Sequence, residues 1–230
     1  MKILGFLAKW LLVLCLPVLL VTASLAWAVN SFWLYKSGLE KYDITRVTGI
    51  SQTELDKAAA GLIHYFNSNE ANISLTVTRN GQPFELFNQR EANHLRDVKG
   101  LIWLDYRVLL ATLAYAAIYI AVSIMLRRRR ELARALLYGS GFSLALMMVI
   151  GAGIMLDFEQ LFIQFHLLSF SNDLWQLDPA RDYLIMMFPE GFWNDAAVYI
   201  ALAAAGMAIV LGGVSAVYLK LTASQAEQTS

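Results

Sequence analysis

The stretch AAVYIALAAAGMAIVLGGVSAVYL, residues 196–219, carries no charged side chain and is long enough to cross a membrane as a helix. About 20 apolar residues in a helix span the roughly 30 Å hydrocarbon layer of a bilayer. Three further stretches share this character, at residues 10–29, 108–126 and 135–156. Hydrophobic residues make up 58% of the chain and charged residues 16%, whereas soluble domains are about 45–50% apolar. The sequence therefore predicts a mainly α membrane protein with four transmembrane helices.

The charged residues outside these stretches are unevenly distributed, which orients the chain. Basic residues precede the first stretch (Lys2, Lys9), fill the connection 127–134 and begin the tail at Lys220. Because basic connections tend to stay in the cytoplasm, we expect both termini there and two extracytoplasmic segments. The predicted order is transmembrane helix 1 (1–29), extracytoplasmic cap (30–107), transmembrane helix 2 (108–126), basic cytoplasmic loop (127–134), transmembrane helix 3 (135–156), extracytoplasmic interfacial loop (157–195), transmembrane helix 4 (196–219) and cytoplasmic tail (220–230).

The first stretch has a second interpretation, as a cleaved signal peptide. Ala26, Trp27 and Ala28 resemble a small-x-small cleavage site after a basic start. The apolar run exceeds the ~7–15 residues of a signal-peptide core, and Trp27 suits a membrane interface, so we expect an uncleaved anchor. Cys15, the only cysteine, lies inside this run. That excludes an intramolecular disulfide and a multi-cysteine metal site, and it argues against a thiol nucleophile.

The segment 30–107 is patterned as a small folded α+β cap. The capping box SQTE (51–54) precedes a helix predicted at 52–67. Residues 72–78 alternate as a strand, and 83–87 can pair with them across Asn80-Gly81, which suits a turn with two positive φ angles.

A second capping box, NQRE (88–91), starts a helix that carries His94 and either continues into the second transmembrane helix or bends at Gly100. Residues 158–170 are almost as apolar as a membrane span, so we expect a short helix at the membrane interface or beneath the cap. Asp178-Pro179 is predicted to start another short helix.

All three histidines lie in the extracytoplasmic segments, and two of them, His94 and His166, lie in the runs nearest to the apolar spans. Histidine exchanges protons near neutral pH, which suits general acid or base catalysis. Asp97 follows His94 at helical spacing and could orient its imidazole. Both histidines also have a structural interpretation, His94 on a solvated helix face and His166 in a core bound to a backbone carbonyl.

Two other kinds of catalytic site are weaker interpretations. A zinc site would need Asp97, Asp173 or Asp182 as a third ligand, and no metal-binding spacing supports one. Ser169 and Ser171 lie near His166, but neither sits in a nucleophile elbow. We therefore expect no metal and no cofactor.

The runs NHLRDVKGL (93–101) and FHLLSFSNDLWQLDPARDYLIMMFPEGFW (165–193) together resemble the paired signature of the Lit family, the bacterial lipoprotein intramolecular transacylases and their relatives. The resemblance implies four transmembrane helices under an extracytoplasmic cap, in the bacterial cytoplasmic (inner) membrane. It also implies that the sn-2 acyl chain of a diacylglyceryl lipoprotein moves to the amine of its N-terminal cysteine, with His94 and His166 as the catalytic pair.

The remaining residues of these runs are candidates for supporting roles. We expect orienting or substrate-binding roles for Asp97, Lys99, Arg96, Trp175, Asp178, Asp182, Phe188 and Trp193. The expected partners are the lipoprotein substrate and membrane lipids, without nucleic acid. The competing interpretation is a non-enzymatic membrane protein whose cap binds a partner or lipid; transport is disfavoured because the spans lack ionisable residues.

Overall fold

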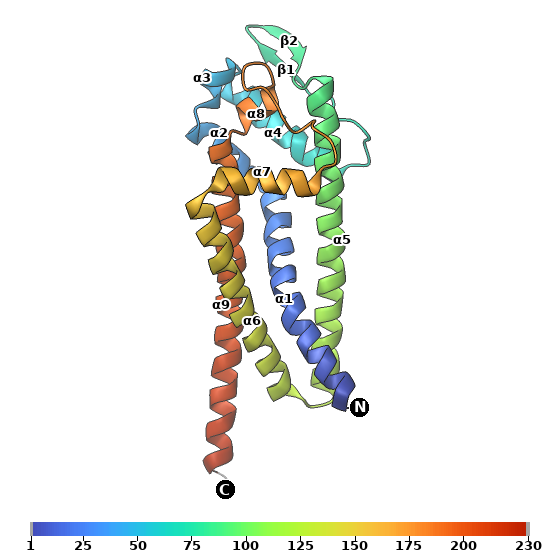
Figure 1. Ribbon diagram of the computed structural model, residues 1–230, viewed down its shortest axis with the longest axis vertical. Coiled ribbons are helices and arrows are strands. Elements are labelled where there is room, and N and C mark those ends of the chain that lie inside the picture. Colours follow the sequence, from blue (N-terminus) through green and yellow to red (C-terminus); the bar gives the residue numbers. More distant parts are fainter. Residues whose placement is uncertain (1, 229–230) are drawn as a thin grey trace. The chain divides into compact units, whose positions relative to one another are not determined.

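The computed structural model describes residues 2–228, with side chains described from residue 3 to residue 224. The elements are α1 (Lys2–Asn30), α2 (Phe32–Lys41), α3 (Ile44–Thr48), α4 (Gln52–Asn67), β1 (Thr76–Arg79), β2 (Gln82–Glu85), α5 (Gln89–Met125), α6 (Arg129–Leu156), α7 (Phe158–Ser169), α8 (Tyr183–Met187) and α9 (Glu190–Gln228) (Figure 1). Within the described residues, α1, α5, α6 and α9 are long and apolar enough to cross a membrane. The predicted fold class is therefore confirmed.

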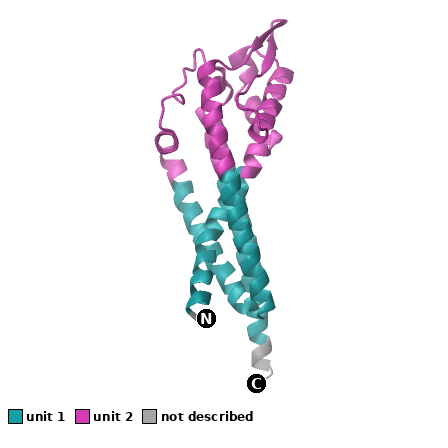
Figure 2. Cartoon of the chain, turned by 90° about the vertical axis from the view of Figure 1, so that its right-hand side faces the viewer, with its two compact units in different colours: residues 1–25, 105–152, 199–230 teal, residues 26–104, 153–198 magenta. Residues whose placement is uncertain are grey.

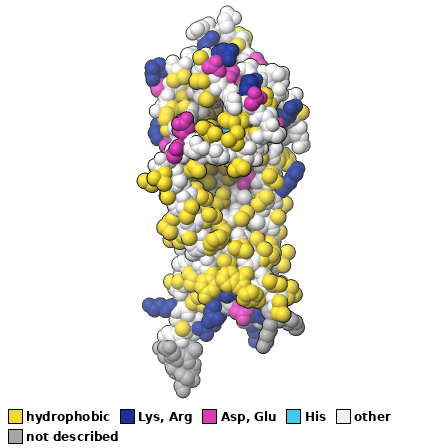
Figure 3. Space-filling view, viewed as in Figure 1, with side chains coloured by type: hydrophobic (Ala, Val, Ile, Leu, Met, Phe, Trp, Pro, Cys, Tyr) yellow, Lys and Arg dark blue, Asp and Glu magenta, His cyan; other side chains and the backbone are white. Residues whose placement is uncertain are grey.

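The chain divides into two compact units, coloured separately in Figure 2. Unit 1 comprises residues 1–25, 105–152 and 199–230. Its helices pack through small and aliphatic side chains, and the Gly139 backbone lies so close to Leu16 that a Cβ there would come within 2.8 Å of it. Other apolar side chains of this unit point outward, such as Leu202 at 62% and Val210 at 65% exposure. Hydrophobic side chains cover these helices in Figure 3, as a lipid-facing surface requires.

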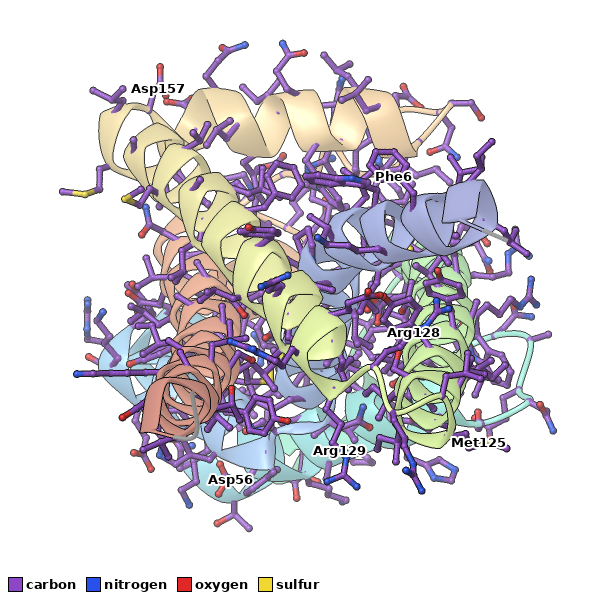
Figure 4. All side chains as sticks on the ribbon, turned by 90° about the horizontal axis from the view of Figure 1, so that it is seen from below. Phe6, Asp56, Met125, Arg128, Arg129 and Asp157 are labelled. Atoms are coloured by element: carbon purple, nitrogen blue, oxygen red, sulfur yellow. The ribbon has the colours of Figure 1, made fainter. Side chains whose placement is uncertain are left out.

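The turn between α5 and α6 is shorter than the predicted basic loop 127–134. Only residues 126–128 lie between the two helices, and Arg127 adopts a positive φ of 57°. Figure 4 shows Met125, Arg128 and Arg129 around this turn. The remaining basic residues lie in the first turns of α6, because Arg, Leu, Ala and Glu all favour a helix and no glycine or proline interrupts them.

Unit 2 comprises residues 26–104 and 153–198 and contains the predicted α+β elements. Helix α4 has the predicted bounds. The hairpin is antiparallel, and its turn residues Asn80 and Gly81 have φ of 53° and 77°, as predicted. Strand β1 begins at Thr76 rather than at residue 72, because the Leu75 amide donates to the Glu85 carboxylate instead of to a backbone carbonyl.

Helix α5 is continuous from Gln89 to Met125, so the bend considered at Gly100 does not exist. A single glycine costs a helix only about 1 kcal/mol. The buried side chains of Leu95 and Ile102, on either side of Gly100, hold the helix against the rest of unit 2. At ~1.5 Å per residue, His94 lies about 21 Å along the helix before the predicted span that begins at Val108.

Two short helices complete unit 2. Helix α7 confirms the helix expected after the third span, and Asp157 caps it where α6 ends (Figure 4). The expectation of a helix from Asp178 was wrong, because α8 begins only at Tyr183. The Asp182 carboxylate accepts from the Asp178 amide and from the Asn88 side chain, which holds residues 178–182 in a turn.

Candidate active site

His94 lies on the second turn of α5, inside unit 2. Its side chain is only 6% exposed, so the solvated-face interpretation is wrong. Burial lowers its pKa from 6.5 to about 4, with a smaller contribution from His166 and an opposing one from the Asp97 carboxylate. The ring is therefore neutral at neutral pH. Its Nδ1 has no hydrogen-bond partner among the described residues.

His166 lies on the last turn of α7 and is 7% exposed. Its Nδ1 is 2.7 Å from the carbonyl oxygen of Phe162, one turn earlier. Because a carbonyl oxygen can only accept, Nδ1 carries the proton and Nε2 of the neutral ring carries the lone pair. Burial lowers the pKa of His166 below its usual value, and the Phe162 hydrogen bond acts in the opposite direction.

The two imidazoles are tilted relative to each other within a small aromatic cluster. Their ring centroids are 6.1 Å apart with an interplanar angle of 31°. The Phe170 ring contacts both, at 5.1 Å from His94 and 5.6 Å from His166. Helix α7 runs crosswise to α5, which brings its last turn to the first turns of α5 (Figure 1). Residues 72 positions apart in the sequence are thereby joined in one site.

Aromatic rings cover His166 from several sides. Phe162 lies 4.3 Å and Trp175 lies 4.9 Å from its ring, centroid to centroid. Trp193 reaches the same cluster through Phe162, at 6.3 Å. These rings displace water from the imidazole, which accounts for its lowered pKa. Trp175 therefore lies against the His166 ring, whereas Trp193 reaches it only through Phe162.

Asp97 does not hold the His94 ring by a hydrogen bond to Nδ1. Its carboxylate accepts instead from the side-chain amide of Asn172, at 2.9 Å. Asp97 acts on His94 only through its charge, which favours the protonated ring. The Asn172 hydrogen bond also ties α5 to the segment that carries Trp175.

Glu91, three residues before His94, is a buried carboxylate that the sequence did not single out beyond its capping box. Its side chain is 1% exposed, and its two oxygens accept from the amides of Asn88, at 2.8 Å, and Leu184, at 2.6 Å. Burial raises the pKa of this carboxyl, and both amides oppose the rise. Asp182, 7% exposed, accepts from the Asn88 side chain beside it. This network joins α5 to the start of α8, 93 residues later.

Other predicted residues lie away from the histidines. Lys99 is buried, and its ammonium donates to the Glu70 carbonyl at 2.8 Å and lies 4.1 Å from the centre of the Tyr65 ring, so it fastens α5 to the end of α4. Phe188 packs against Tyr35.

Three more side chains lie near the surface of unit 2. Arg96 is exposed. Asp178 accepts from Arg181 and the Ala180 amide in the turn before α8. The third histidine, His64, has an exposed side chain. The part of the chain that the structure describes holds no group of three His, Cys, Asp or Glu side chains placed for a metal ion.

A helical membrane protein with two buried, neutral histidines in contact belongs to the class of proteins equipped for general acid-base chemistry near a lipid phase. The model of the family "Lipoprotein intramolecular transacylase Lit" matches residues 10–193. The chain therefore belongs to the Lit family, whose members are acyltransferases. This assignment favours the enzyme over the non-enzymatic membrane protein considered above.

Solved structures agree with this fold. The structure of the lipoprotein intramolecular transacylase Lit from Bacillus cereus superimposes with a TM-score of 0.84 at 24% identity, covering 100% of both chains. A variant of that protein with one histidine replaced by arginine gives 0.80 at 22% identity, over 98% of this chain and 96% of the other. The corresponding alanine variant gives 0.79 at 22%, over 100% and 97%. No curated protein matches the chain.

Proposed function

We propose that this protein moves the sn-2 acyl chain of a diacylglyceryl lipoprotein from the glyceryl oxygen to the amine of the lipoprotein's N-terminal cysteine, using His94 and His166. The contact between the two buried imidazoles, with centroids 6.1 Å apart, is the observation that carries the proposal. It brings two proton-exchanging groups within reach of one substrate. The products are an amide on the cysteine and a free hydroxyl on the glyceryl group.

His166 is the general base. Its Nδ1 proton is engaged by the Phe162 carbonyl, so Nε2 is the atom that takes a proton from the attacking amine. The amine nitrogen then bonds to the ester carbonyl carbon, giving a tetrahedral oxyanion. When the bond from that carbon to the glyceryl oxygen breaks, the proton held on Nε2 passes to the leaving oxygen. His166 is neutral again at the end, so the proton balance closes.

His94 stabilises the oxyanion. A ring whose pKa is about 4 remains neutral and carries one N–H donor at neutral pH. Because its Nδ1 has no partner in the described part of the chain, the ring has hydrogen-bonding capacity left for the substrate. A donor in a dry site stabilises developing negative charge more strongly than one in water.

The substrate itself supplies much of the catalytic advantage. The amine and the ester belong to one molecule, so the enzyme only has to fold them together. The apolar rings of Phe162, Phe170 and Trp175 around the histidines exclude water, which would otherwise compete with the amine for the ester.

The test is the mass of a lipoprotein made in a bacterial host that lacks an enzyme of this kind. The wild-type chain should convert the diacylglyceryl cysteine into an N-acyl, S-monoacylglyceryl cysteine of unchanged total mass, distinguished by fragmentation. His94→Ala and His166→Ala should abolish the product. His64→Ala is the matched control, since His64 is exposed and should leave the product unchanged. Equal products from all four proteins would overturn the proposal.

The basic residues at the α5–α6 turn and the first helix support a cytoplasmic location for both termini and an extracytoplasmic site. The test uses a Cys15→Ser background, which removes the only native thiol. Asn80→Cys in the hairpin turn should react with a membrane-impermeant maleimide added outside the inner membrane, and Arg128→Cys should not. The reverse pattern would invert the proposed orientation.

A further inference from the structure

A polar cavity of about 330 Å³ lies inside unit 2 at the N-terminal end of α5. It is lined by Asn88, Arg90, Gln176, Asp178, Arg181 and Asp182. A larger cavity of about 740 Å³ is lined by residues of α3, α4 and the hairpin, and none of its lining residues comes from α5 or α7. Of these two cavities, only the smaller one is lined by a residue of the helix that carries His94, and the acyl-transfer steps proposed above do not use it.

The smaller cavity lies about one helical turn from His94 and is connected to His166 through the segment that carries Trp175. Arg90 precedes His94 by four residues, so the two side chains lie on one face of α5, one turn or ~6 Å apart. The Arg90 guanidinium also donates to the backbone carbonyl of Asp173, two residues before Trp175. Trp175 in turn covers the His166 ring. The cavity is thus separated from the reacting groups by about one helical turn.

The lining of the cavity presents free arginine donors beside carboxylates whose oxygens each already accept a hydrogen bond. The Asp182 carboxylate is already engaged by Asn88 and the Asp178 amide, and the Asp178 carboxylate by Ala180 and Arg181. A guanidinium has five N–H donors. Arg181, with 78% of its side chain exposed, therefore has donors left over. A ligand that presents several carbonyl oxygens would accept hydrogen bonds from these donors.

We propose that this cavity binds the backbone carbonyls of the polypeptide that follows the lipidated cysteine of the substrate. The inference rests on the proposed function, which places that cysteine's amine at the histidine pair. An extended chain advances ~3.3–3.6 Å per residue, so the second and third residues after the cysteine reach the cavity. Because every peptide carries these carbonyls, the cavity senses the presence of a polypeptide and not its sequence.

Binding of an unreactive substrate mimic tests this subsite separately from the reaction. Two probes carry a diacylglyceryl cysteine whose amine is acetylated. One ends in an amide at the cysteine, and the other continues with Gly-Ser-Gly-Ser amide. The full-length protein in lipid nanodiscs should bind the longer probe about tenfold more tightly, as one or two hydrogen bonds would provide. The double variant Gln176→Ala/Arg181→Ala should reduce this ratio toward one.

Arg46→Ala is the matched control for that variant. Arg46 pairs with Asp43 three residues before it, as Arg181 pairs with Asp178, and both arginine side chains are 78% exposed. The control should keep the tenfold ratio. A wild-type ratio of one, or a ratio unchanged in the double variant, would overturn the subsite. Binding of the probes with no turnover of a free-amine lipopeptide would instead overturn the proposed reaction and leave the subsite standing.

Discussion

The two helices that carry the histidines are held in place by different forces. The first turns of α5 are fixed by buried polar contacts, with Glu91 bound to the Leu184 amide and Lys99 bound to the Glu70 carbonyl. Around α7, aromatic rings of the helix and of the segment after it surround His166, and Leu168 is 86% exposed. The His166 ring is hydrogen-bonded to a carbonyl oxygen of its own helix, that of Phe162.

In the proposed function, this difference suits the two histidines to different steps. The bond within α7 fixes the tautomer of His166 wherever the helix moves as a body. In α5 the polar contacts fix the helix but leave the His94 ring with an unengaged Nδ1. One ring is therefore set up as an acceptor, and the other can donate to whatever occupies the site.

The largest expected effect comes from removing the two histidines in turn. Removing the base with His166→Ala should lower the rate constant of acyl transfer by about 10²–10⁴-fold. Removing the donor with His94→Ala should lower it by about 10²–10³-fold. Single-turnover measurements on a synthetic diacylglyceryl lipopeptide would separate the two. If His94→Ala lost more activity than His166→Ala at every pH, His94 would be the base and His166 the donor.

Breaking the polar contacts that hold α5 should give the next largest effect, a loss in the free energy of unfolding. Glu91→Ala leaves the buried Leu184 amide without an acceptor, which costs about 1–3 kcal/mol, and it also removes the acceptor of the part-buried Asn88 amide. The free energy of unfolding in mixed micelles should fall by about 1–3 kcal/mol. Glu40→Ala is the control, because Glu40 is exposed and only 3.9 Å from Lys36. Equal losses in the two variants would show that the network does not anchor α5.

Acid should destabilise the fold through His94. Its pKa is about 4 in the folded protein and near 6.5 when unfolded, so the unfolded chain binds more protons between these values. The contribution of the neutral His94 to the free energy of unfolding is fully present above pH 6.5. It should fall by about 3 kcal/mol as the pH drops to 4. Replacing the ring with His94→Phe should flatten this part of the curve, and His64→Phe should not. If the stability of the wild-type protein did not fall in this range, the His94 ring would be exposed to water and not buried.

The smallest expected effect comes from the aromatic cover of α7. Trp175→Leu removes one ring contact with His166, worth about 0.5–1.5 kcal/mol, and admits water to the site. The pKa of His166 should rise toward 6.5, and the acid limb of the rate profile should move to higher pH with it. Trp33→Leu, at an exposed position, is the control. An unmoved acid limb would show that Trp175 does not exclude water from the ring.

The sequence was most informative where structure is set by neighbours along the chain. The spans follow from runs of apolar residues, the hairpin from Asn80-Gly81, and α4 from its capping serine. Even here a tertiary contact changes the local pattern, because the Glu54 carboxylate of the capping box accepts a hydrogen bond from the Thr78 amide of the hairpin. The start of α8 was misplaced for the same reason, since Asp182 is engaged by Asn88.

The candidate site shows the same limit. Both histidines could be picked out from their segments, and the resemblance paired them. The partner of Asp97 could not be read from spacing, because Asn172 lies 75 residues away. A carboxylate three residues from a histidine shares its helix face, but the tertiary fold decides which donor it meets.

The sequence by itself determined that this is a four-span membrane protein with its three histidines outside the apolar runs, because hydrophobicity and helix periodicity are local properties. Only the tertiary structure decided that the rings of His94 and His166 meet, that Glu91 reaches the Leu184 amide, and that the Nδ1 atom of His166 is engaged while that of His94 is not. Those contacts depend on how α7 and the segment after it fold back against α5. Burial then shifts the pKa values of both histidines, which no local pattern encodes.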